Sequence, residues 1–280
     1  MSNIYYVNGK YANKKDSLIS VNDRSLQFSD SIYEVIGIYN RRLLFWDDHI
    51  KRLELSLGKL GINFKFSVRT LEILSKQIIR KNSVDEGILY IQISRGISER
   101  NHIWNDTIKP SLIITSKKAK FVFSNKKRVS IVTDDDNRWL NCDIKSTSLL
   151  ANVLSKNKAN LKKSFECWLV NKDGFITEGS SSNSWIIKNK KIYTTPTTEN
   201  ILSGVTRKII IKCANICNLP VLEQKFTIKD AYEADEAFLS STSALIIGIN
   251  KINNKTINPK NNYFIVDKLQ KTLKSLIINA

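Results

Sequence analysis

The chain has 280 residues, 42% of them hydrophobic and 25% charged, and 44 Lys and Arg against 26 Asp and Glu give a formal net charge of +18. This apolar content is enough to bury the core of one or two domains, and no run of eighteen apolar residues predicts a membrane span. The N-terminus lacks the charged and apolar regions of a signal peptide, and the four cysteines form no disulfide framework, so we expect a cytoplasmic protein.

The positive charge raises the question of a nucleic-acid partner, because lysine-rich faces neutralise phosphates. The lysines are dispersed along the chain, however, and no nucleic-acid-binding motif accompanies them. We therefore expect no nucleic-acid partner and interpret the abundance of Lys, Asn and Ile as a compositional bias of the source. A basic nucleic-acid-binding protein stays open as an alternative from a different functional class.

Residues 1–118 are expected to form an α+β domain. An Asn8-Gly9 turn between two short apolar segments predicts a β-hairpin. Asp47 and Asp48, followed by apolar residues at helical spacing, predict a helix that ends at Gly61. The expected strands span residues 4–7, 10–12, 31–39, 87–94 and 111–116, and the expected helices span residues 46–60 and 68–81.

Residues 119–127, charged and loosely patterned, are the expected linker to a second domain over residues 128–280. Its expected strands span residues 129–133, 166–170, 175–177, 182–187, 192–194, 236–240 and 244–249. One helix is expected after Lys145, with Leu149, Leu150, Val153, Leu154 and Leu161 on its apolar side, and two more are expected over residues 204–217 and 262–277. Cys213 and Cys217 share the second helix, but the chain has only two histidines, so we expect core packing and no metal site.

Lys145 is the first candidate catalytic residue. It precedes Ser146 and Thr147 and then a helix, so it lies near the positive end of the helix dipole, where a positive charge is disfavoured. A lysine whose neutral amine is favoured can attack an aldehyde and form a Schiff base. Because a single lysine before a helix is ordinarily a solvated residue, this interpretation depends on the other motifs.

Three further segments suit an anion such as a phosphate. Residues 202–206, Leu-Ser-Gly-Val-Thr, have a glycine at a helix start, where backbone N–H groups can approach the anion. The others are the hydroxyl cluster of residues 240–243 and Arg52, on the polar side of the first long helix. Together with Lys145 and Glu178 they suggest pyridoxal phosphate, which needs a Schiff-base lysine, a phosphate cradle and an acidic partner for its ring nitrogen.

Three motifs in this order resemble the class IV aminotransferases of fold-type IV. They are Arg-Trp-Leu-x-Cys-Asp-Ile-Lys-Ser from residue 138, Thr-Glu-Gly-Ser-Ser-Ser-Asn from residue 177 and Ile-Leu-x-Gly-Val-Thr-Arg from residue 201. Within that family, Arg100-Asn101-His102 is similar to the Arg-x-His carboxylate trap of D-amino acid aminotransferases. Residues 27–34, Gln-Phe-x-Asp-x-x-Tyr-Glu, and residues 47–53, Asp-Asp-His-Ile-x-Arg-Leu, resemble the same group.

The resemblance covers nearly the whole chain and implies an α+β fold. A small N-terminal α/β domain and a larger C-terminal α/β pseudo-barrel domain would hold the cofactor, pyridoxal 5'-phosphate, at their interface. Lys145 would form the Schiff base and shuttle the proton between substrate and cofactor, and Glu178 would pair with the protonated ring nitrogen. The residues implied to hold the rest of the cofactor are Arg52, Gly204, Val205, Thr206, Ser241 and Thr242 at the phosphate and Leu202 at the ring.

The same resemblance implies that Tyr33, Arg100 and His102 bind the substrate carboxylate. Arg100 and His102 would come from the neighbouring subunit, which implies a homodimer with a shared active site. We therefore expect a transaminase acting between a D-amino acid such as D-alanine and a 2-oxo acid, 2-oxoglutarate or pyruvate. A branched-chain L-amino acid aminotransferase and an aminodeoxychorismate lyase are alternatives with the same fold.

This chain departs from the pattern of the D-amino acid group at two places. Ser29 and Ser31 stand where the group usually has glycines, close to Tyr33. Residues 246–248, Ile-Ile-Gly, contain no proline after the hydroxyl cluster, so we expect a reshaped pocket around the substrate side chain.

Overall fold

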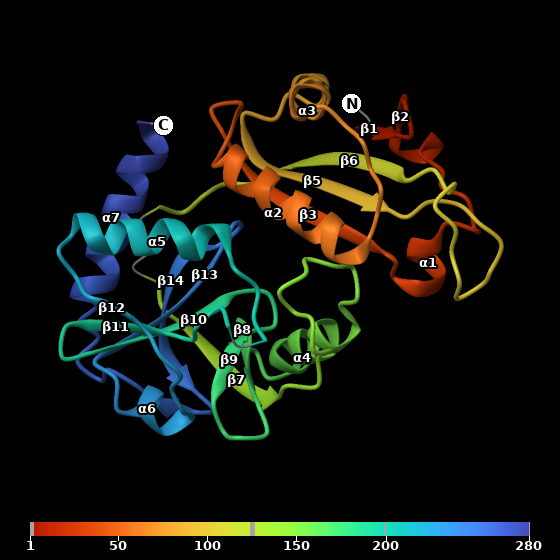
Figure 1. Cartoon of the computed structure of the whole chain (residues 1–280). Coiled ribbons are helices and arrows are strands. Elements are labelled where there is room, and N and C mark those ends of the chain that lie inside the picture. Colours follow the sequence, from red (N-terminus) through yellow and green to blue (C-terminus); the bar gives the residue numbers. More distant parts are fainter. Residues whose placement is uncertain (1–2, 124–126, 199, 280) are drawn as a thin grey trace. The chain divides into compact units, whose positions relative to one another are not determined.

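The computed structural model describes residues 3–123, 127–198 and 200–279, and the chain divides into two compact units (Figure 1). Unit 1 comprises residues 1–121 and 144–148, and unit 2 comprises residues 122–143 and 149–280. Each unit combines a β-sheet with helices, which confirms the expected α+β fold class. Among the described residues, no helix has the length and apolar character needed to cross a membrane.

Unit 1 is built on a six-stranded antiparallel sheet with the strand order β2-β1-β6-β5-β3-β4. The strands are β1 (Ile4–Val7), β2 (Lys10–Asn13), β3 (Ser31–Tyr39), β4 (Arg42–Leu43), β5 (Glu86–Ser94) and β6 (Ser111–Lys118). Asn8 and Gly9 both have positive φ, as a two-residue hairpin turn requires. Because β3 pairs with β5 along its whole length, Tyr33 and Glu34 have fixed positions opposite Gln92 and Ile91.

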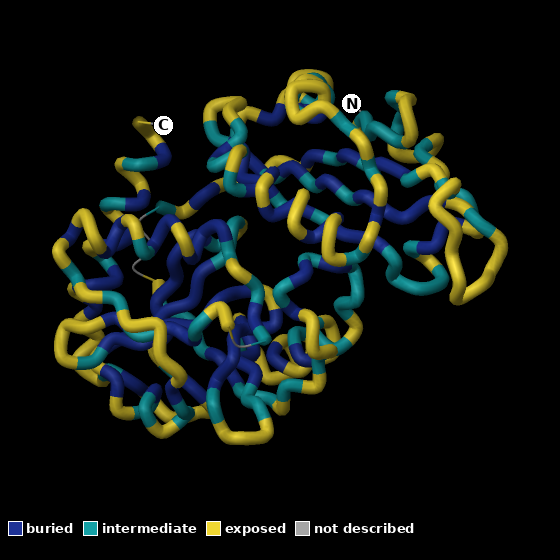
Figure 2. The backbone as a smooth tube through the Cα atoms, in the orientation of Figure 1, coloured by how far each residue is buried: buried dark blue, intermediate teal, exposed yellow. Residues whose placement is uncertain are grey.

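Two long helices, α2 (Trp46–Leu60) and α3 (Val68–Lys81), pack their apolar residues into one core with this sheet. The buried segments of the strands and of both helices are visible as dark blue tube in Figure 2. The apolar spacing predicted both helices correctly. It missed the short α1 (Arg24–Phe28), which the Asp23 side chain caps, and the 3-10 turn η1 (Lys14–Asp16), because neither is long enough to display a helical period.

Unit 2 contains a nine-stranded mixed sheet with the path β12-β11-β10-β13-β14-β7-β8-β9, to which β15 adds beside β14. The strands are β7 (Val129–Asp135), β8 (Glu166–Val170), β9 (Ile176–Gly179), β10 (Asn183–Lys188), β11 (Lys191–Thr194), β12 (Val221–Glu223), β13 (Glu236–Ser241), β14 (Leu245–Ile252) and β15 (Lys255–Thr256). The Ser184 hydroxyl on β10 donates to the carbonyl of Thr177 on the end strand β9, at 3.3 Å. The sheet therefore curls back toward its own middle, as expected for a pseudo-barrel.

The helices of unit 2 are α4 (Leu150–Leu161), α5 (Val205–Ile216), α6 (Ile228–Tyr232) and α7 (Phe264–Ile278). Cys213 on α5 and Cys217, the residue that ends it, are buried, which confirms their expected place in the core. α6 was not expected; a capping box between Thr227 and Asp230 begins it.

Helix α4 turns its apolar side away from its own sheet. Ser155 and Ala159 are buried, and Ala159 packs with Val132, Cys167 and Leu169 of strands β7 and β8. Four residues of the predicted apolar stripe are instead exposed, with exposed fractions of 73% at Leu150, 57% at Val153, 62% at Leu154 and 76% at Leu161, and Leu149 before the helix is half-buried. The sequence identified the stripe correctly but not the direction in which it faces.

Residues 144–148 lie in unit 1, whereas the expected second domain spans residues 128–280. They belong to unit 1 because Ser146 pairs with Ile32 at the start of β3, although the surrounding chain belongs to unit 2. Unit 1 otherwise extends to Phe121, and residues 124–126 of the expected linker lie outside the described residues. The chain thus leaves unit 1 after Phe121, returns to it at Ile144 and leaves again after Ser148.

Candidate active site

Lys145 is held against the first residues of β3 by main-chain hydrogen bonds. The N–H of Tyr33 donates to the carbonyl of Lys145 at 2.9 Å, and the N–H of Thr147 donates to the carbonyl of Ser31 at 3.0 Å. The N–H of Lys145 also donates to the Ser56 hydroxyl on α2, at 3.3 Å. The segment that carries the lysine is therefore fixed to the sheet of unit 1 at its backbone, and its side chain alone is left to move.

Tyr33 lies directly beside this lysine. The Nζ atom of Lys145 is 4.3 Å from the centre of the Tyr33 ring, and that ring stacks on Tyr90 of β5 with the centroids 5.7 Å apart. The Tyr90 hydroxyl donates to Gln92 at 2.7 Å, and burial raises the pKa of Tyr90 to about 12. Tyr90 is therefore a neutral phenol that supports Tyr33.

Arg52 is anchored by a buried carboxylate on the neighbouring strand. Its Nε and Nη2 atoms donate to the two carboxylate oxygens of Glu34 at 2.8 and 2.7 Å, and Nδ1 of His49 lies 2.7 Å from the same carboxylate. His49 and Arg52 can share this partner because residues three apart lie on one face of α2. The arrangement fixes Arg52 in a two-point ion pair, which leaves its orientation little freedom.

The charges of this group are well defined. Burial by itself would raise the pKa of Glu34, but the Arg52 charge and the hydrogen bonds from Arg52 and His49 lower it to about 2. Burial lowers the pKa of His49 in spite of Glu34, so the imidazole is neutral at neutral pH and donates from Nδ1. The net charge of the group is therefore zero, with the guanidinium of Arg52 as its only cation.

Arg100 and His102 lie together on the exposed loop between β5 and β6. The Arg100 guanidinium is 5.3 Å from the centre of the Phe28 ring, and the His102 ring centroid is 5.2 Å from the same ring. The structure thus brings the two predicted trap residues to one aromatic side chain of α1. Among the described residues of unit 1, no hydrogen bond or ring contact connects them to Tyr33 or Lys145.

In unit 2, Glu178 is the point at which the three sequence motifs meet. It is buried at the end of β9 and accepts from Nη1 of Arg138 at 2.5 Å, from Nδ2 of Asn183 at 3.0 Å and from the N–H of Leu202 at 3.1 Å. Arg138 opens the first motif, Asn183 closes the second and Leu202 belongs to the third. Both carboxylate oxygens are therefore directed by donors from three separate segments.

Arg138 is shared between two carboxylates. Besides Glu178 it binds Asp136 through Nε and Nη2, both at 2.8 Å, and its side chain is 4% exposed. Burial raises the pKa of Glu178, and the Arg138 charge opposes that rise. With both carboxylates ionised, Asp136, Arg138 and Glu178 together carry a net charge of −1. One added cation at Glu178 would balance it.

The N-terminus of α5 lies next to this carboxylate. Gly204 is the residue that precedes the helix, and a Cβ atom there would be only 2.2 Å from Oδ1 of Asn183. Asn183 also donates to the carbonyl of Leu202, at 3.1 Å. Glycine is needed here because Asn183 occupies the space of a side chain, and the helix then starts with N–H groups that have no partner within it.

Ser241 and Thr242 follow at the end of β13, whose residue Ser240 pairs with Asn183 of β10. The hydroxyl of Ser240 accepts a hydrogen bond from Nε1 of Trp185 at 2.9 Å and so serves the core. The hydroxyl of Ser241 accepts from the N–H of Ala244 at 3.2 Å. The sheet register therefore brings the hydroxyl cluster and the start of α5 to the same end of β10.

The predicted residues are thus divided between the two units. Unit 1 carries Tyr33, Arg52, Arg100, His102 and Lys145, and unit 2 carries Glu178, Leu202, Gly204, Val205, Thr206, Ser241 and Thr242. Their chemistry fits pyridoxal phosphate: an amine, a buried carboxylate that can pair with a cation, and a helix start near hydroxyls that can donate to an anion.

Sequence reasoning missed the residues that orient these groups. They are Glu34 and His49 beside Arg52, and Asp136, Arg138 and Asn183 around Glu178. Glu34, His49, Arg138 and Asn183 all stand within the matched motifs, so membership of a motif was the available signal. Asp136 lies outside every motif, and only the fold identifies it.

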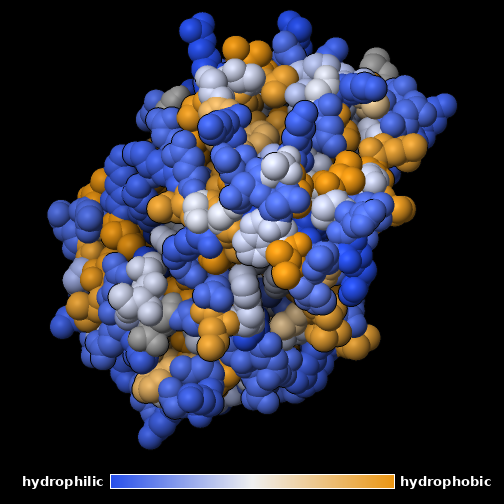
Figure 3. Space-filling model, turned by 45° about the vertical axis from the view of Figure 1, so that its right-hand side comes forward, coloured by the Kyte–Doolittle hydropathy of each residue, from blue (hydrophilic) through white to orange (hydrophobic). Residues whose placement is uncertain are grey.

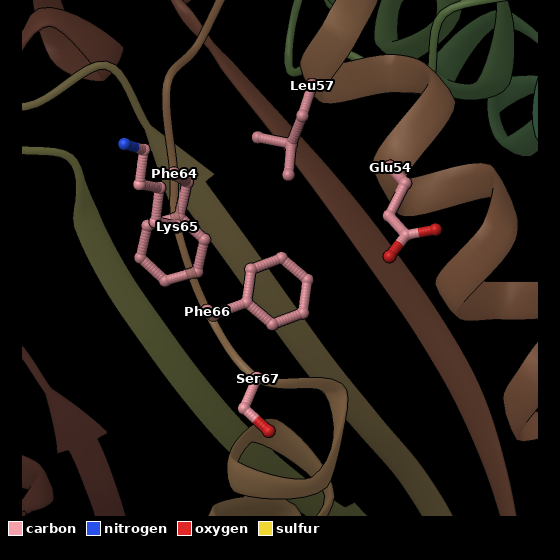
Figure 4. A pocket seen from close by; sticks show the side chains of 6 residues that line it. All are labelled: Glu54, Leu57, Phe64, Lys65, Phe66 and Ser67. Atoms are coloured by element: carbon pink, nitrogen blue, oxygen red, sulfur yellow. The ribbon is translucent and has the colours of Figure 1, made fainter.

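A surface pocket on unit 1 is separate from all of these residues. It is lined by Glu54 and Leu57 of α2 and by residues 64–67 before α3, with the rings of Phe64 and Phe66 side by side (Figure 4). None of the predicted site residues lines it.

In the view of Figure 3, hydrophilic residues are spread over the visible face with apolar residues scattered among them, which agrees with dispersed lysines.

Comparison with known proteins gives a consistent family match. The family model described as amino-transferase class IV matches residues 31–252. The chain is 36% identical over 255 residues to a D-alanine aminotransferase of Staphylococcus aureus, covering 90% of each protein. It is 38% identical over 251 residues to a D-alanine aminotransferase of Bacillus licheniformis, covering 89% of this chain and 88% of that protein.

Solved structures of the same fold are more distant in sequence. A branched-chain amino acid aminotransferase of Escherichia coli superposes with a TM-score of 0.91 at 21% identity. The match covers 99% of this chain and 95% of the other. At that identity the likeness establishes the fold alone.

Proposed function

The chain belongs to the class IV aminotransferases, and we propose on that premise that it exchanges an amino group between a D-amino acid and a 2-oxo acid. D-alanine would be the amino donor and 2-oxoglutarate or pyruvate the acceptor. Aminotransferases of this class depend on pyridoxal phosphate, which we propose as the cofactor here. The observation that carries the proposal is the buried Glu178, whose two carboxylate oxygens are held by donors from three motifs.

Pyridoxal phosphate, when bound, supplies an electron sink for the negative charge that develops at the substrate Cα. Glu178 would pair with the protonated ring nitrogen, because a cation there balances the charges of Asp136, Arg138 and Glu178. The N-terminus of α5 from Gly204 to Thr206 would hold the phosphate together with the hydroxyls of Ser241 and Thr242. Arg52 would add a guanidinium and Leu202 an apolar contact.

Lys145 would supply the amine that binds the cofactor and would move the proton at Cα. Its backbone is fixed to β3 by the hydrogen bonds of Tyr33 to Lys145 and of Thr147 to Ser31, so the motion needed for proton transfer is confined to the flexible side chain. Tyr33, Arg100 and His102 would bind the substrate carboxylate. An arginine suits this task because its planar group can donate two parallel hydrogen bonds to a carboxylate.

We also propose that the protein works as a homodimer with Arg100 and His102 reaching the partner's site. Two features support this. The loop of these residues is exposed in the single chain, and α4 presents an exposed apolar stripe from Leu150 to Leu161 that an isolated chain would leave in water. The expected cytoplasmic location stays a prediction.

The role of Lys145 can be tested by chemical labelling. Borohydride reduction of the holoenzyme should abolish its visible absorbance band and attach the pyridoxyl group to one lysine. Peptide mapping should identify Lys145, and Lys145→Ala should lose transamination. A label on any other lysine would refute the assignment.

The substrate class can be tested by a half-reaction with D- and L-amino acids, followed through the same absorbance band. We expect D-selectivity, and in Arg100→Ala a rise in KM for D-alanine equivalent to about 1.5–3 kcal/mol of lost binding. A branched-chain enzyme, which shares the fold, is the second candidate. Faster reaction with L-leucine or L-isoleucine, indifferent to Arg100, would establish that enzyme instead, and pyruvate release from aminodeoxychorismate would indicate the lyase.

A further inference from the structure

The loop between β5 and β6 carries Arg100 and His102 but has little support of its own. Residues 99–107 are all exposed, and the loop contains no helix or strand between Ser94 and Ser111. A carboxylate trap needs fixed donors, because each mobile side chain loses conformational entropy on binding. Something outside the loop must therefore hold it.

Arg24 of α1 makes that connection through a buried guanidinium. Its Nη1 atom donates to the carbonyl of Asn101 at 2.6 Å, and Nη2 lies at 3.5 Å from the carbonyl of His102. The N–H of Arg24 donates to the carbonyl of Gly96 at 2.9 Å, near the start of the same loop. Arg24 is 3% exposed, so these charge-assisted contacts are shielded from water and hold the main-chain carbonyls of Asn101 and His102, the two residues that follow Arg100.

Asp30 keeps this arginine in place. One of its oxygens, Oδ2, accepts from Nε of Arg24 and from Nε of Arg95, both at 2.7 Å. Arg95 in turn donates to the carbonyls of Leu60 and Gly61 at the end of α2, at 2.7 and 2.9 Å. A single carboxylate thus ties the base of the loop to two helices, and with two guanidiniums around it the group is positive, as suits an anionic ligand.

Phe28 restrains the side chains of the trap. The guanidinium of Arg24 lies 4.6 Å from the centre of its ring, that of Arg100 lies 5.3 Å from the same centre, and the ring also contacts the His102 ring. A cation over an aromatic face is attracted to it, and the ring limits the rotamers that Arg100 can adopt. Phe28 is therefore a platform for both trap residues.

We propose that Arg24, Phe28 and Asp30 are positioning residues that pre-form the Arg100–His102 loop for the carboxylate of the substrate. The proposal rests on the proposed function, since it assigns this loop to substrate binding. In this proposal Phe28 and Asp30, in the first half of the motif at residues 27–34, position the loop. The second half, Tyr33 and Glu34, serves Lys145 and Arg52 instead.

The test is steady-state kinetics of the holoenzyme with D-alanine and 2-oxoglutarate. Arg24→Met keeps the length of the side chain and removes its donors, so KM for D-alanine should rise by about tenfold or more while kcat stays within about threefold. Hydrogen exchange of residues 99–107 should become faster. Arg128→Met, which removes a buried, ion-paired arginine of unit 2, is the matched control and should change neither KM nor exchange in the loop.

A double-mutant cycle separates positioning from general destabilisation. If Arg24 acts through Arg100, Arg24→Met should add little to the KM of Arg100→Ala. Additive effects, or an unchanged KM in Arg24→Met, would overturn the proposal. Should Arg24→Met fail to fold, Phe28→Leu and Arg24→Lys must still raise KM by several fold with normal cofactor absorbance, and their failure to do so would overturn it equally.

Failure of the proposed function has a different signature. A wild type that reacts only with L-amino acids would refute D-amino acid transamination. The positioning proposal would then stand if Arg24→Met raised KM for those L-substrates, and it would fail if KM did not change.

Discussion

Two buried carboxylates, Glu34 and Glu178, meet the cost of burial in different ways. Glu34 receives both arms of Arg52 and a hydrogen bond from His49, and its pKa falls to about 2. Glu178 receives one arm of Arg138, whose other donors bind Asp136, and burial keeps its pKa raised. The first carboxylate is fully neutralised and orients Arg52. The second retains the capacity to bind a further cation.

Arg138 should therefore control the charge of Glu178. In Arg138→Met the pKa of Glu178 should rise further, because burial is no longer opposed, and a protonated carboxyl cannot balance a protonated ring nitrogen. We expect kcat to fall by about two orders of magnitude, or about 3 kcal/mol of transition-state stabilisation. Glu178→Gln should lose a similar amount. The measurement is kcat against pH, together with the pH titration of cofactor absorbance.

The controls distinguish charge from packing. Arg138→Lys keeps a cation and should recover part of the activity, and Arg128→Met should behave as wild type because its partner is Asp267. Wild-type kcat and an unshifted pH profile in Arg138→Met would contradict this role.

The lowered pKa of Glu34 predicts that the free energy of unfolding falls in acid. Its pKa is about 2 in the folded chain against an ordinary value of 4.5, so the stabilisation is complete above about pH 4.5 and is lost as the pH falls toward 2. The full contribution is about 3 kcal/mol, of which about 2 kcal/mol should be lost by pH 3. Urea unfolding at pH 6 and pH 3 should reveal this loss in the wild type and not in Glu34→Gln. Parallel losses in both proteins would contradict the assignment.

At the scale of elements, the junction between β10 and α5 is the most constrained part of the site. Asn183 is the first residue of β10. Its side chain donates to Glu178 and to the carbonyl of Leu202 and fills the space beside Gly204, so one side chain contacts both the start of the strand and the start of the helix. The φ of Gly204 is −66°, which any residue can adopt. The need for glycine here is a matter of space and not of backbone conformation.

Gly204→Ala should accordingly displace Asn183 and disturb both Glu178 and the helix start. We expect the affinity for pyridoxal phosphate to fall by about tenfold or more, measured by titrating the apoenzyme through cofactor absorbance. Gly58→Ala on α2 is the matched control, since nothing lies within 4 Å of its Cβ. That change should leave affinity unchanged and stabilise the helix by about 0.5–1 kcal/mol. Equal cofactor affinity in both variants would refute the steric argument.

At the scale of the whole molecule, some of the predicted site residues belong to unit 1 and the others to unit 2. The chain passes from one unit to the other after Phe121, before Ile144 and after Ser148. The Lys145 segment pairs with β3 of unit 1, whereas Glu178 and the start of α5 belong to unit 2. The net charge of +18 is spread over both units and would favour the approach of anionic substrates and of a phosphate.

The exposed stripe of α4 predicts how the assembly can be disrupted. Leu154→Glu places a charge in the stripe, so a dimer that buries it should weaken by more than about a hundredfold, equivalent to about 3 kcal/mol. Sedimentation should detect the monomer, and the circular dichroism should be unchanged because Leu154 does not face the core. Leu55→Glu, at an exposed leucine of α2 among polar neighbours, is the control and should leave the assembly intact. A Leu154→Glu protein that sediments as the wild type would rule out this interface.

The sequence by itself determined the elements and the chemical groups. Helical and strand periods located the long helices and every described strand except β4, β12 and β15, because each period is a local property of a few consecutive residues and these three strands have only two or three. Motifs likewise predicted Lys145 and Glu178 as candidates. Short elements such as α1 and α6 escaped because they contain too few residues to display a period.

Only the tertiary structure decided which residues act on one another. Arg138 reaches Glu178 across 40 positions of sequence, and Arg24 reaches Asn101 across 77. Spacing along the chain carries no information about such pairs, because the folding of each unit brings together segments that are far apart in the sequence. For the same reason the apolar stripe of α4 was predictable from the sequence, while its exposure depended on Ser155 and Ala159 being the residues that fit against the sheet.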